Sequence, residues 1–125
     1  MKVAGIGFRS AATAADLQAA LALAGEDVDA LASIAEKAAA PAMQDLARST
    51  GLPVIALKDQ DIVGEQTLTC SPRIKARFGT GSLAEAAALA GARHGVPGAR
   101  ARLIAPRVVT ADGLATAAIA ERLEP

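Results

Sequence analysis

The apolar residues of this chain fall into short runs that are separated by glycine, proline or charge. Residues 2–7 predict a short buried strand that runs into a glycine turn. Residues 52–57 predict the clearest strand, because the run is apolar and β-branched and is followed by a Lys-Asp pair. Residues 32–37 are expected to form a short strand that ends in charge, although their alanines suit a helix equally well. A polar turn over 26–29 is expected to start a short helix through Leu31.

Between the expected strands, apolar residues recur at helical spacing. The predicted helices are 14–24, 41–50, 72–78 and 82–91, with a single helical turn at 59–63. Thr13 and Asp16 have the spacing of a capping box, and Gly25 is placed to end the first helix. Proline stands at the first helical position of the second and third helices, where its missing N–H is tolerated. In the second helix, Met43 and Leu46 are expected to face the core.

The C-terminal part of the chain predicts two further strands. Residues 102–106 form the first, and its final proline suggests that it ends at a sheet edge. A strong Asp-Gly turn follows, and residues 114–120 are expected to form the last strand. Residues 64–69 give a weak signal, either an irregular segment or an edge strand at 67–70. The order of elements therefore predicts an α/β fold of three α/β/α layers, with helices on both faces of a mostly parallel or mixed sheet.

Length and composition narrow the class of protein. A chain of 125 residues is expected to be one domain, residues 1–125, around a single core. No apolar run is long enough to cross a membrane, and the N-terminus lacks the pattern of a signal peptide. With Cys70 as the sole cysteine, no internal disulfide is possible, which fits a reducing, cytoplasmic location. Phe8 and Phe78 are the only aromatic residues, which argues against a stacking surface for single-stranded nucleic acid.

Charge is balanced overall but unevenly distributed along the chain. The formal net charge is zero. Residues 1–65 hold five Lys or Arg and nine Asp or Glu, whereas residues 66–125 hold eight and four. A basic C-terminal half in a neutral chain favours a small anionic ligand over a nucleic-acid partner, for which a larger excess is expected.

A glycine-rich loop leads directly into the most alanine-rich helix. Ser82 is placed as its N-cap, Glu85 three residues later has the spacing of a capping box, and Gly91 is placed to end it. Gly79 and Gly81 would let backbone N–H groups approach an anion at the positive end of the helix. From spacing alone, a well-capped helix after a tight turn is the more frequent structure, so both interpretations stay open.

The remaining chemistry points to binding of anionic groups. One histidine and one cysteine give no metal-ligand cluster, so no metal and no cofactor are expected. His94 is expected to be a solvated loop residue, and Cys70 a small buried hydrophobe. The turn after the first strand is not a dinucleotide fingerprint, because Ser10 replaces its third glycine, but a carboxylate or phosphate could sit there. Cations stand beside turns at Arg9, Lys37, Arg73, Arg77 and Arg107, and together they suit a ligand with several carboxylates.

Several segments, taken in order, carry a family resemblance. They are residues 3–9, Lys37, Asp45-Leu46-Ala47, 51–53, Ser71-Pro72, 79–88 and 116–120. With them the chain resembles the cobalamin biosynthesis CobE family, whose members are similar to the C-terminal domain of CbiG. The sequence departs from the family pattern at 38–42, which lacks an acidic residue, and at Ala117, which replaces valine.

The resemblance implies a role in making the corrin ring. CbiG proteins open the ring-contraction lactone of a cobalt-precorrin and release acetaldehyde, and this chain matches their second domain. The expected ligand is an anionic tetrapyrrole intermediate of the aerobic route, with other pathway enzymes as further partners and no nucleic acid or membrane. The expected function is binding of this intermediate, with assisted opening of its lactone as a further step. The alternatives are a non-catalytic carrier or scaffold that passes the intermediate between pathway enzymes and, behind it, an unrelated anion-binding regulatory module. The expected substrate contacts are Gly5, Gly7, Arg9, Ser10, Lys37, Gly79, Gly81, Ser82 and Glu85, of which Glu85 and Lys37 are the candidate catalytic residues.

Overall fold

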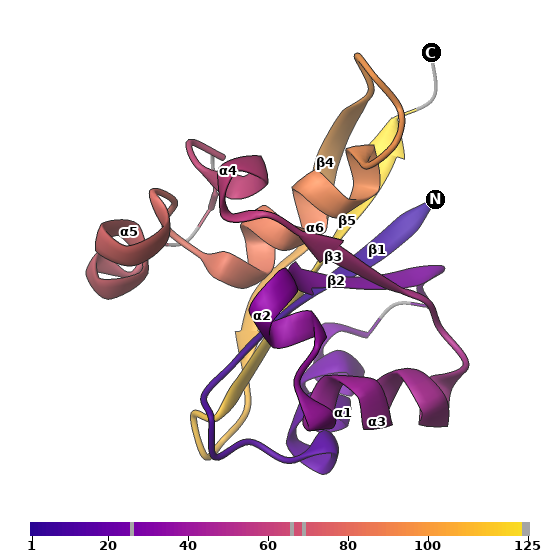
Figure 1. Cartoon of the computed structure of the whole chain (residues 1–125), viewed down its shortest axis with the longest axis vertical. Coiled ribbons are helices and arrows are strands. Elements are labelled where there is room, and N and C mark those ends of the chain that lie inside the picture. The colour runs from indigo at the N-terminus through magenta and orange to yellow at the C-terminus, as the bar shows by residue number, and fades with distance from the viewer. Residues whose placement is uncertain (26, 66, 69, 124–125) are drawn as a thin grey trace.

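A five-stranded mixed sheet forms the centre of the molecule (Figure 1). The computed structural model describes residues 1–25, 27–65, 67–68 and 70–123. The strands are β1 (Lys2–Phe8), β2 (Ala30–Ile34), β3 (Val54–Leu57), β4 (Arg100–Val109) and β5 (Ala115–Leu123), in the spatial order β3-β2-β1-β5-β4. β1, β2 and β3 are parallel, and β5 runs antiparallel to both β1 and β4. The prediction of an α/β fold with a mixed sheet is confirmed.

Helices cover both faces of the sheet. They are α1 (Ala14–Ala24), α2 (Ala35–Ala38), α3 (Pro41–Thr50), α4 (Asp59–Ile62), α5 (Pro72–Phe78) and α6 (Leu83–Arg93). Successive side chains of a strand point to opposite faces, so Val3 joins the core under α6, whereas Ala4 and Ile6 join the core under α1 and α3. In the described residues no helix combines the length and the apolar character needed to span a bilayer.

Most local signals are confirmed by the structure. Thr13 and Asp16 form the predicted capping box of α1, and Gly25 ends that helix at φ 77°. The helix 41–50 has its predicted bounds, with Met43 and Leu46 fully buried.

Helix α6 lies unusually close to the sheet. A Cβ atom on Gly5 would stand 1.9 Å from the carbonyl oxygen of Ala84, so only glycine fits there. A Cβ on Gly91 would lie 2.8 Å from the Cβ of Ala32. The prediction that Gly91 ends this helix is wrong: α6 continues to Arg93, because Gly91 is a contact with the sheet rather than a stop signal.

The structure corrects three other predictions. The helix expected through Leu31 is absent, because Leu31 lies fully buried in β2 and pairs with Val54 of β3. The strand expected at 32–37 begins at Ala30 and ends at Ile34, after which the alanines form α2. β4 continues past Pro106 to Val109, because Pro106 sits in an irregular part of this edge strand. Of the two structures considered for the stretch before α5, the edge strand at 67–70 is not formed at residues 67, 68 and 70, and residue 69 lies outside the described residues.

Candidate functional site

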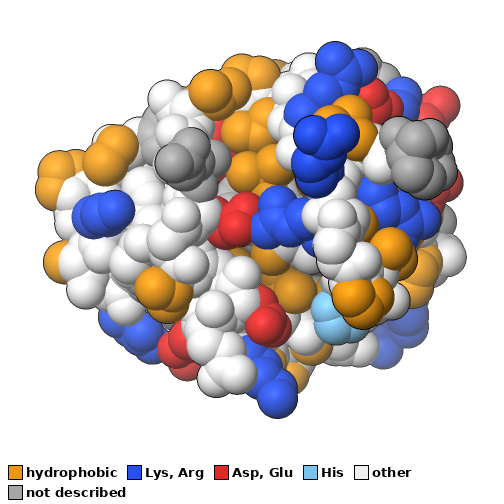
Figure 2. Space-filling model, turned by 90° about the horizontal axis from the view of Figure 1, so that it is seen from above, with side chains coloured by type: hydrophobic (Ala, Val, Ile, Leu, Met, Phe, Trp, Pro, Cys, Tyr) orange, Lys and Arg blue, Asp and Glu red, His pale blue; other side chains and the backbone are white. Residues whose placement is uncertain are grey.

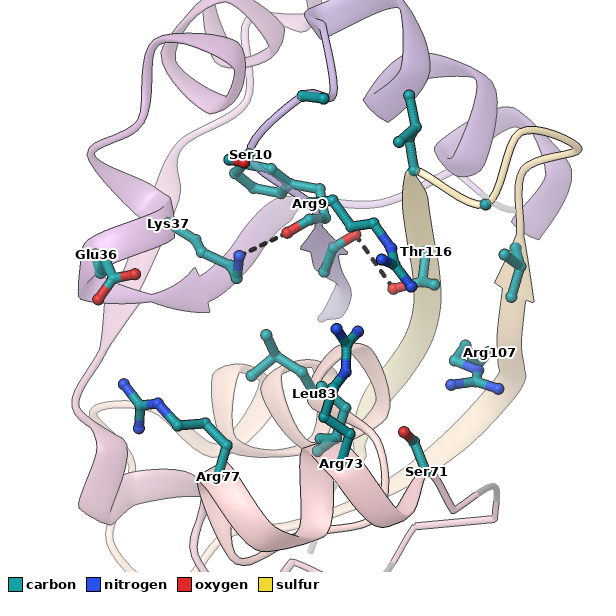
Figure 3. A pocket seen from close by; sticks show the side chains of 17 residues that line it. Arg9, Ser10, Glu36, Lys37, Ser71, Arg73, Arg77, Leu83, Arg107 and Thr116 are labelled. Carbon is teal, nitrogen blue, oxygen red and sulfur yellow. Dashed lines mark hydrogen bonds between the residues drawn. The ribbon is translucent and has the colours of Figure 1, made fainter.

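A cleft of about 840 Å³ opens at the carboxyl ends of β1 and β4 and beside α2, which follows β2. β4 has the same direction as β1, since both are antiparallel to β5. Open α/β sheets place their ligands at this edge. The turn after β1 forms one wall of the cleft, α5 forms another, and the end of β4 forms a third (Figure 3).

Side chains from three other elements fix the end of β1. Its last three carbonyl oxygens each accept a hydrogen bond. Ser33 Oγ donates to Ile6 O at 2.8 Å, and Thr116 Oγ1 donates to Gly7 O at 3.2 Å. Lys37 Nζ donates to Phe8 O at 2.5 Å. A Cβ on Gly7 would lie 2.7 Å from Thr116 Oγ1, so glycine leaves room for this hydroxyl group. The inner end of the cleft is therefore tied to β2, α2 and β5.

Lys37 is half-buried at the cleft wall. Its Nζ atom lies 4.8 Å from the centre of the Phe8 ring, which adds a cation–π contact to the hydrogen bond. Burial lowers the pKa of Lys37 below its usual value, the neighbouring Glu36 raises it, and the Arg73 guanidinium lowers it further. The ammonium group thus sits where a ligand carboxylate would relieve the repulsion from Arg73.

Five cations from four separate segments of the chain line this cleft. They are Arg9 after β1, Lys37 on α2, Arg73 and Arg77 on α5, and Arg107 on β4. Among the described residues, Glu36 is the one acidic residue on the same walls. Arg9 and Arg73 point toward each other from opposite sides of the cleft (Figure 3). Arg77 also lies 3.6 Å from Asp59 Oδ2, in an exposed ion pair. The cleft therefore has a strong excess of positive charge.

A second, smaller hollow of about 470 Å³ lacks this excess. Figure 2 shows a face of the molecule on which acidic and basic side chains touch beside apolar ones. Around the hollow, Arg93 bonds both carboxyl oxygens of Glu65 at 2.6 Å, and Arg102 bonds Glu121 at 2.6 Å. Because these two cations are paired with carboxyl groups of the protein, the first cleft is the better candidate for an anionic ligand.

The first glycine turn lies at the cleft, whereas the second glycine loop is absent from its walls and contacts Val63 and Glu65 instead. Four of the residues predicted to contact the substrate line the cleft: Gly7, Arg9, Ser10 and Lys37. The other expected contacts are absent from its walls: Gly5, Gly79, Gly81, Ser82 and Glu85. Leu83, the first residue of α6, is the part of that helix that reaches the cleft.

Each of these inner residues has a visible structural task. Gly5 admits the backbone of α6, and Gly79 ends α5 at φ 73°, with its N–H donating to Lys75 O. The buried Gly81 accepts a hydrogen bond from Ser71 N at 2.7 Å. Ser82 is the predicted N-cap, since its hydroxyl oxygen accepts from Glu85 N at 3.2 Å. The Glu85 side chain is fully buried and accepts from Arg107 N at 3.0 Å.

Cys70 and His94 are both exposed. Cys70 is exposed, so the expectation that it is buried is wrong; it precedes the exposed helix α5 rather than a core element. His94 is an exposed loop residue, as predicted. Among the described residues there is no group of three or more His, Cys, Asp or Glu side chains that could hold a metal ion.

Sequence reasoning missed the apolar part of the cleft and Thr116. Ile74, Leu83, Val109 and Leu114 also line the walls. Thr116 reaches the cleft because β5 pairs with β1 across more than a hundred residues, and no local signal predicts that pairing.

Comparison with known families identifies the chain. The profile of the family described as "Cobalamin synthesis G C-terminus" matches residues 2–120. The chain belongs to this family. It is therefore a protein of cobalamin biosynthesis, as the resemblance implies.

Solved structures of this cobalamin-synthesis family have the same fold. The crystal structure of CobE, a protein from the cobalamin biosynthetic pathway, is similar with a TM-score of 0.84 and 33% identity, over 100% of this chain and 95% of that one. The cobalamin biosynthesis protein chiG from Agrobacterium tumefaciens strain C58 is similar with a TM-score of 0.71 and 32% identity, over 97% and 98% of the two chains. No curated protein sequence matches the chain.

Proposed function

We propose that this protein binds a polycarboxylate tetrapyrrole intermediate of cobalamin synthesis in the cleft between β1, α5 and β4. The observation that carries the proposal is the gathering of five cations from four segments around one cleft. Membership of a cobalamin-synthesis family supplies the ligand class, because precorrins carry several carboxylate side chains around a macrocycle. A volume of about 840 Å³ lies within the usual range of ligand pockets, about 300–1,000 Å³.

The lining residues divide into two groups that suit such a ligand. The guanidinium groups of Arg9, Arg73 and Arg107 can each bind one carboxylate through two parallel hydrogen bonds. The side chains of Ile74 and Leu83 offer apolar surface to a ring face. In this arrangement the cations hold the periphery of the macrocycle, and the apolar side chains contact its plane.

Assisted opening of the ring-contraction lactone is the second candidate function. It is favoured by the lowered pKa of Lys37, because a neutral amine can accept a proton from attacking water. The hydrogen bond to Phe8 O and the contact with the Phe8 ring stabilise the ammonium form instead, which suits carboxylate binding. Binding is therefore the primary proposal. The cytoplasmic location and the pathway-enzyme partners stay predictions.

Titration of the purified protein tests the proposal. Absorbance is followed while a late pathway intermediate, or a porphyrin polycarboxylate as a stable probe, is added. Arg9→Gln should weaken binding about tenfold or more, the amount expected for one lost charge-assisted contact. Arg48→Gln is the matched control, because Arg48 is exposed on α3 and bonds Asp45 rather than lining the cleft. Equal affinities of the two variants would contradict the proposal. Incubation with a lactone-bearing precorrin separates turnover from binding alone.

A further inference from the structure

The strand that carries Arg107 into the cleft is interrupted by a bulge. In the pairing of β4 with β5, Ala105 stands opposite Ile119 and Val108 stands opposite Ala117. Two residues of β4, Pro106 and Arg107, thus oppose the single residue between these partners on β5. Such bulges change the direction of the local side chains and often occur beside functional sites.

The bulge needs a hydrogen-bond acceptor from outside the sheet. Pro106 has no N–H group, so it loses nothing at this position. Arg107 keeps its N–H, which donates to Oε2 of Glu85 at 3.0 Å. Glu85 reaches this position from α6 with a side chain that is 0% exposed. A buried carboxyl group of the helix therefore satisfies the backbone of the bulged strand.

We infer that Glu85 is a positioning residue for Arg107. By holding the N–H of the bulge, it keeps the Arg107 side chain directed toward the cleft, where Figure 3 shows it beside β4. This inference rests on the proposed function, because it assigns Arg107 a carboxylate of the ligand. It gives Glu85 an indirect role, since Glu85 is absent from the cleft walls.

Two substitutions of Glu85 distinguish the role of its hydrogen-bond acceptor from the role of its side-chain volume. Glu85→Gln keeps a side-chain oxygen that can accept from Arg107 N, so this variant should retain most of the affinity for the probe. Glu85→Leu keeps a similar volume but removes the acceptor. Arg107→Ala removes the guanidinium group and retains the backbone N–H that Glu85 binds.

A double-mutant cycle with a porphyrin polycarboxylate tests the inference. Arg107→Ala should weaken binding about tenfold. Glu85→Leu should weaken binding several-fold in the wild-type background and by no further factor in the Arg107→Ala background. The effect of Glu85→Leu on the melting temperature should be the same in both backgrounds, because Arg107→Ala retains the backbone N–H that Glu85 binds. Full additivity of the two losses in affinity, or unchanged affinity on Glu85→Leu, would overturn the inference.

A readout without ligand keeps the two proposals apart. In the wild type and in Glu85→Gln, the backbone amide of Arg107 should exchange slowly with deuterated solvent. If Glu85→Leu folds, the same amide should exchange much faster, and unchanged protection would overturn the inference. If Glu85→Leu does not fold, loss of both affinity and amide protection in the folded Glu85→Gln would also overturn it, since the retained acceptor should rescue both. Failure of the wild type to bind the probe would count against the proposed function, while the amide still reports whether Glu85 holds the bulge.

Discussion

Replacing Gly5 by alanine tests how strongly the position of α6 depends on a single missing side chain. A Cβ at residue 5 would lie 1.9 Å from Ala84 O and 2.5 Å from Ala88 N. Both neighbours are backbone atoms of α6, so no change of side-chain rotamer relieves the overlap. Real Cβ contacts shorter than 3.0 Å are essentially unknown, so α6 and β1 must move apart by roughly the difference between 1.9 and 3.0 Å.

The cost of this retreat can be estimated from packing. Overfilled cores lose about 1–3 kcal/mol, and we expect the upper end or beyond, because the whole helix must move. A gap of ~1 Å also removes up to about half of the dispersion energy of each contact that it opens. A domain of this length has a total stability of about 5–15 kcal/mol, so a loss of ~3 kcal/mol is a large fraction. The melting temperature should fall by about 10 °C or more.

Chemical and thermal unfolding of three glycine variants provides the assay. Gly5→Ala should be the least stable. Gly91→Ala should follow, because its Cβ would meet the side chains of Ala32 and Val3 at 2.8 and 3.0 Å. Gly51→Ala is the control: no atom of the described residues lies within 4 Å of its Cβ, and it carries only the strain of φ +72°, about 1 kcal/mol. If Gly5→Ala proved as stable as Gly51→Ala, close helix packing would not explain Gly5.

Further predictions concern the cleft. Because burial lowers the pKa of Lys37 below 10.5, probe affinity should fall as pH rises through that lowered value, and Lys37→Arg should remove this step in absorbance titrations. Between that lowered pKa and 10.5, Lys37 is protonated in the unfolded chain but largely neutral in the folded one. Through Lys37, the free energy of unfolding measured in urea should therefore increase as pH rises across this range. Arg73→Gln should weaken probe binding about tenfold with little change in melting temperature, since Arg73 is exposed on α5. Thr116→Val should cost about 1 kcal/mol in urea unfolding, because the hydrogen bond to Gly7 O is lost.

Local signals predict much of this fold. The capping box of α1, the proline at the start of α3 and the left-handed glycine at its end each act within a few residues, so their effects can be inferred from sequence. The sequence also singles out the five cations beside turns that the structure places around one cleft.

Contacts between distant segments could not be predicted in the same way. Gly91 resembles a helix stop in sequence, but it is a contact with β1 and β2 in the structure. The alanines after Ile34 suit several structures, and the burial of β2 between β1 and β3 decides where the strand ends. For Glu85, a cap and a ligand contact could both be inferred, while its partner Arg107 lies 22 residues away on a bulge.

The glycines of β1 connect the fold to the site. Gly5 and Gly7 lie on the face of β1 that is turned toward α6, two residues apart as strand periodicity requires. Gly5 lets the backbone of α6 approach, which brings Leu83 to the cleft wall and Glu85 beneath the bulge of β4. Gly7 leaves room for the Thr116 hydroxyl, which holds the end of β1 at the inner end of the cleft. A larger side chain at residue 5 would thus disturb the cleft indirectly, because it would move α6 and with it Glu85, which accepts the hydrogen bond from Arg107 N.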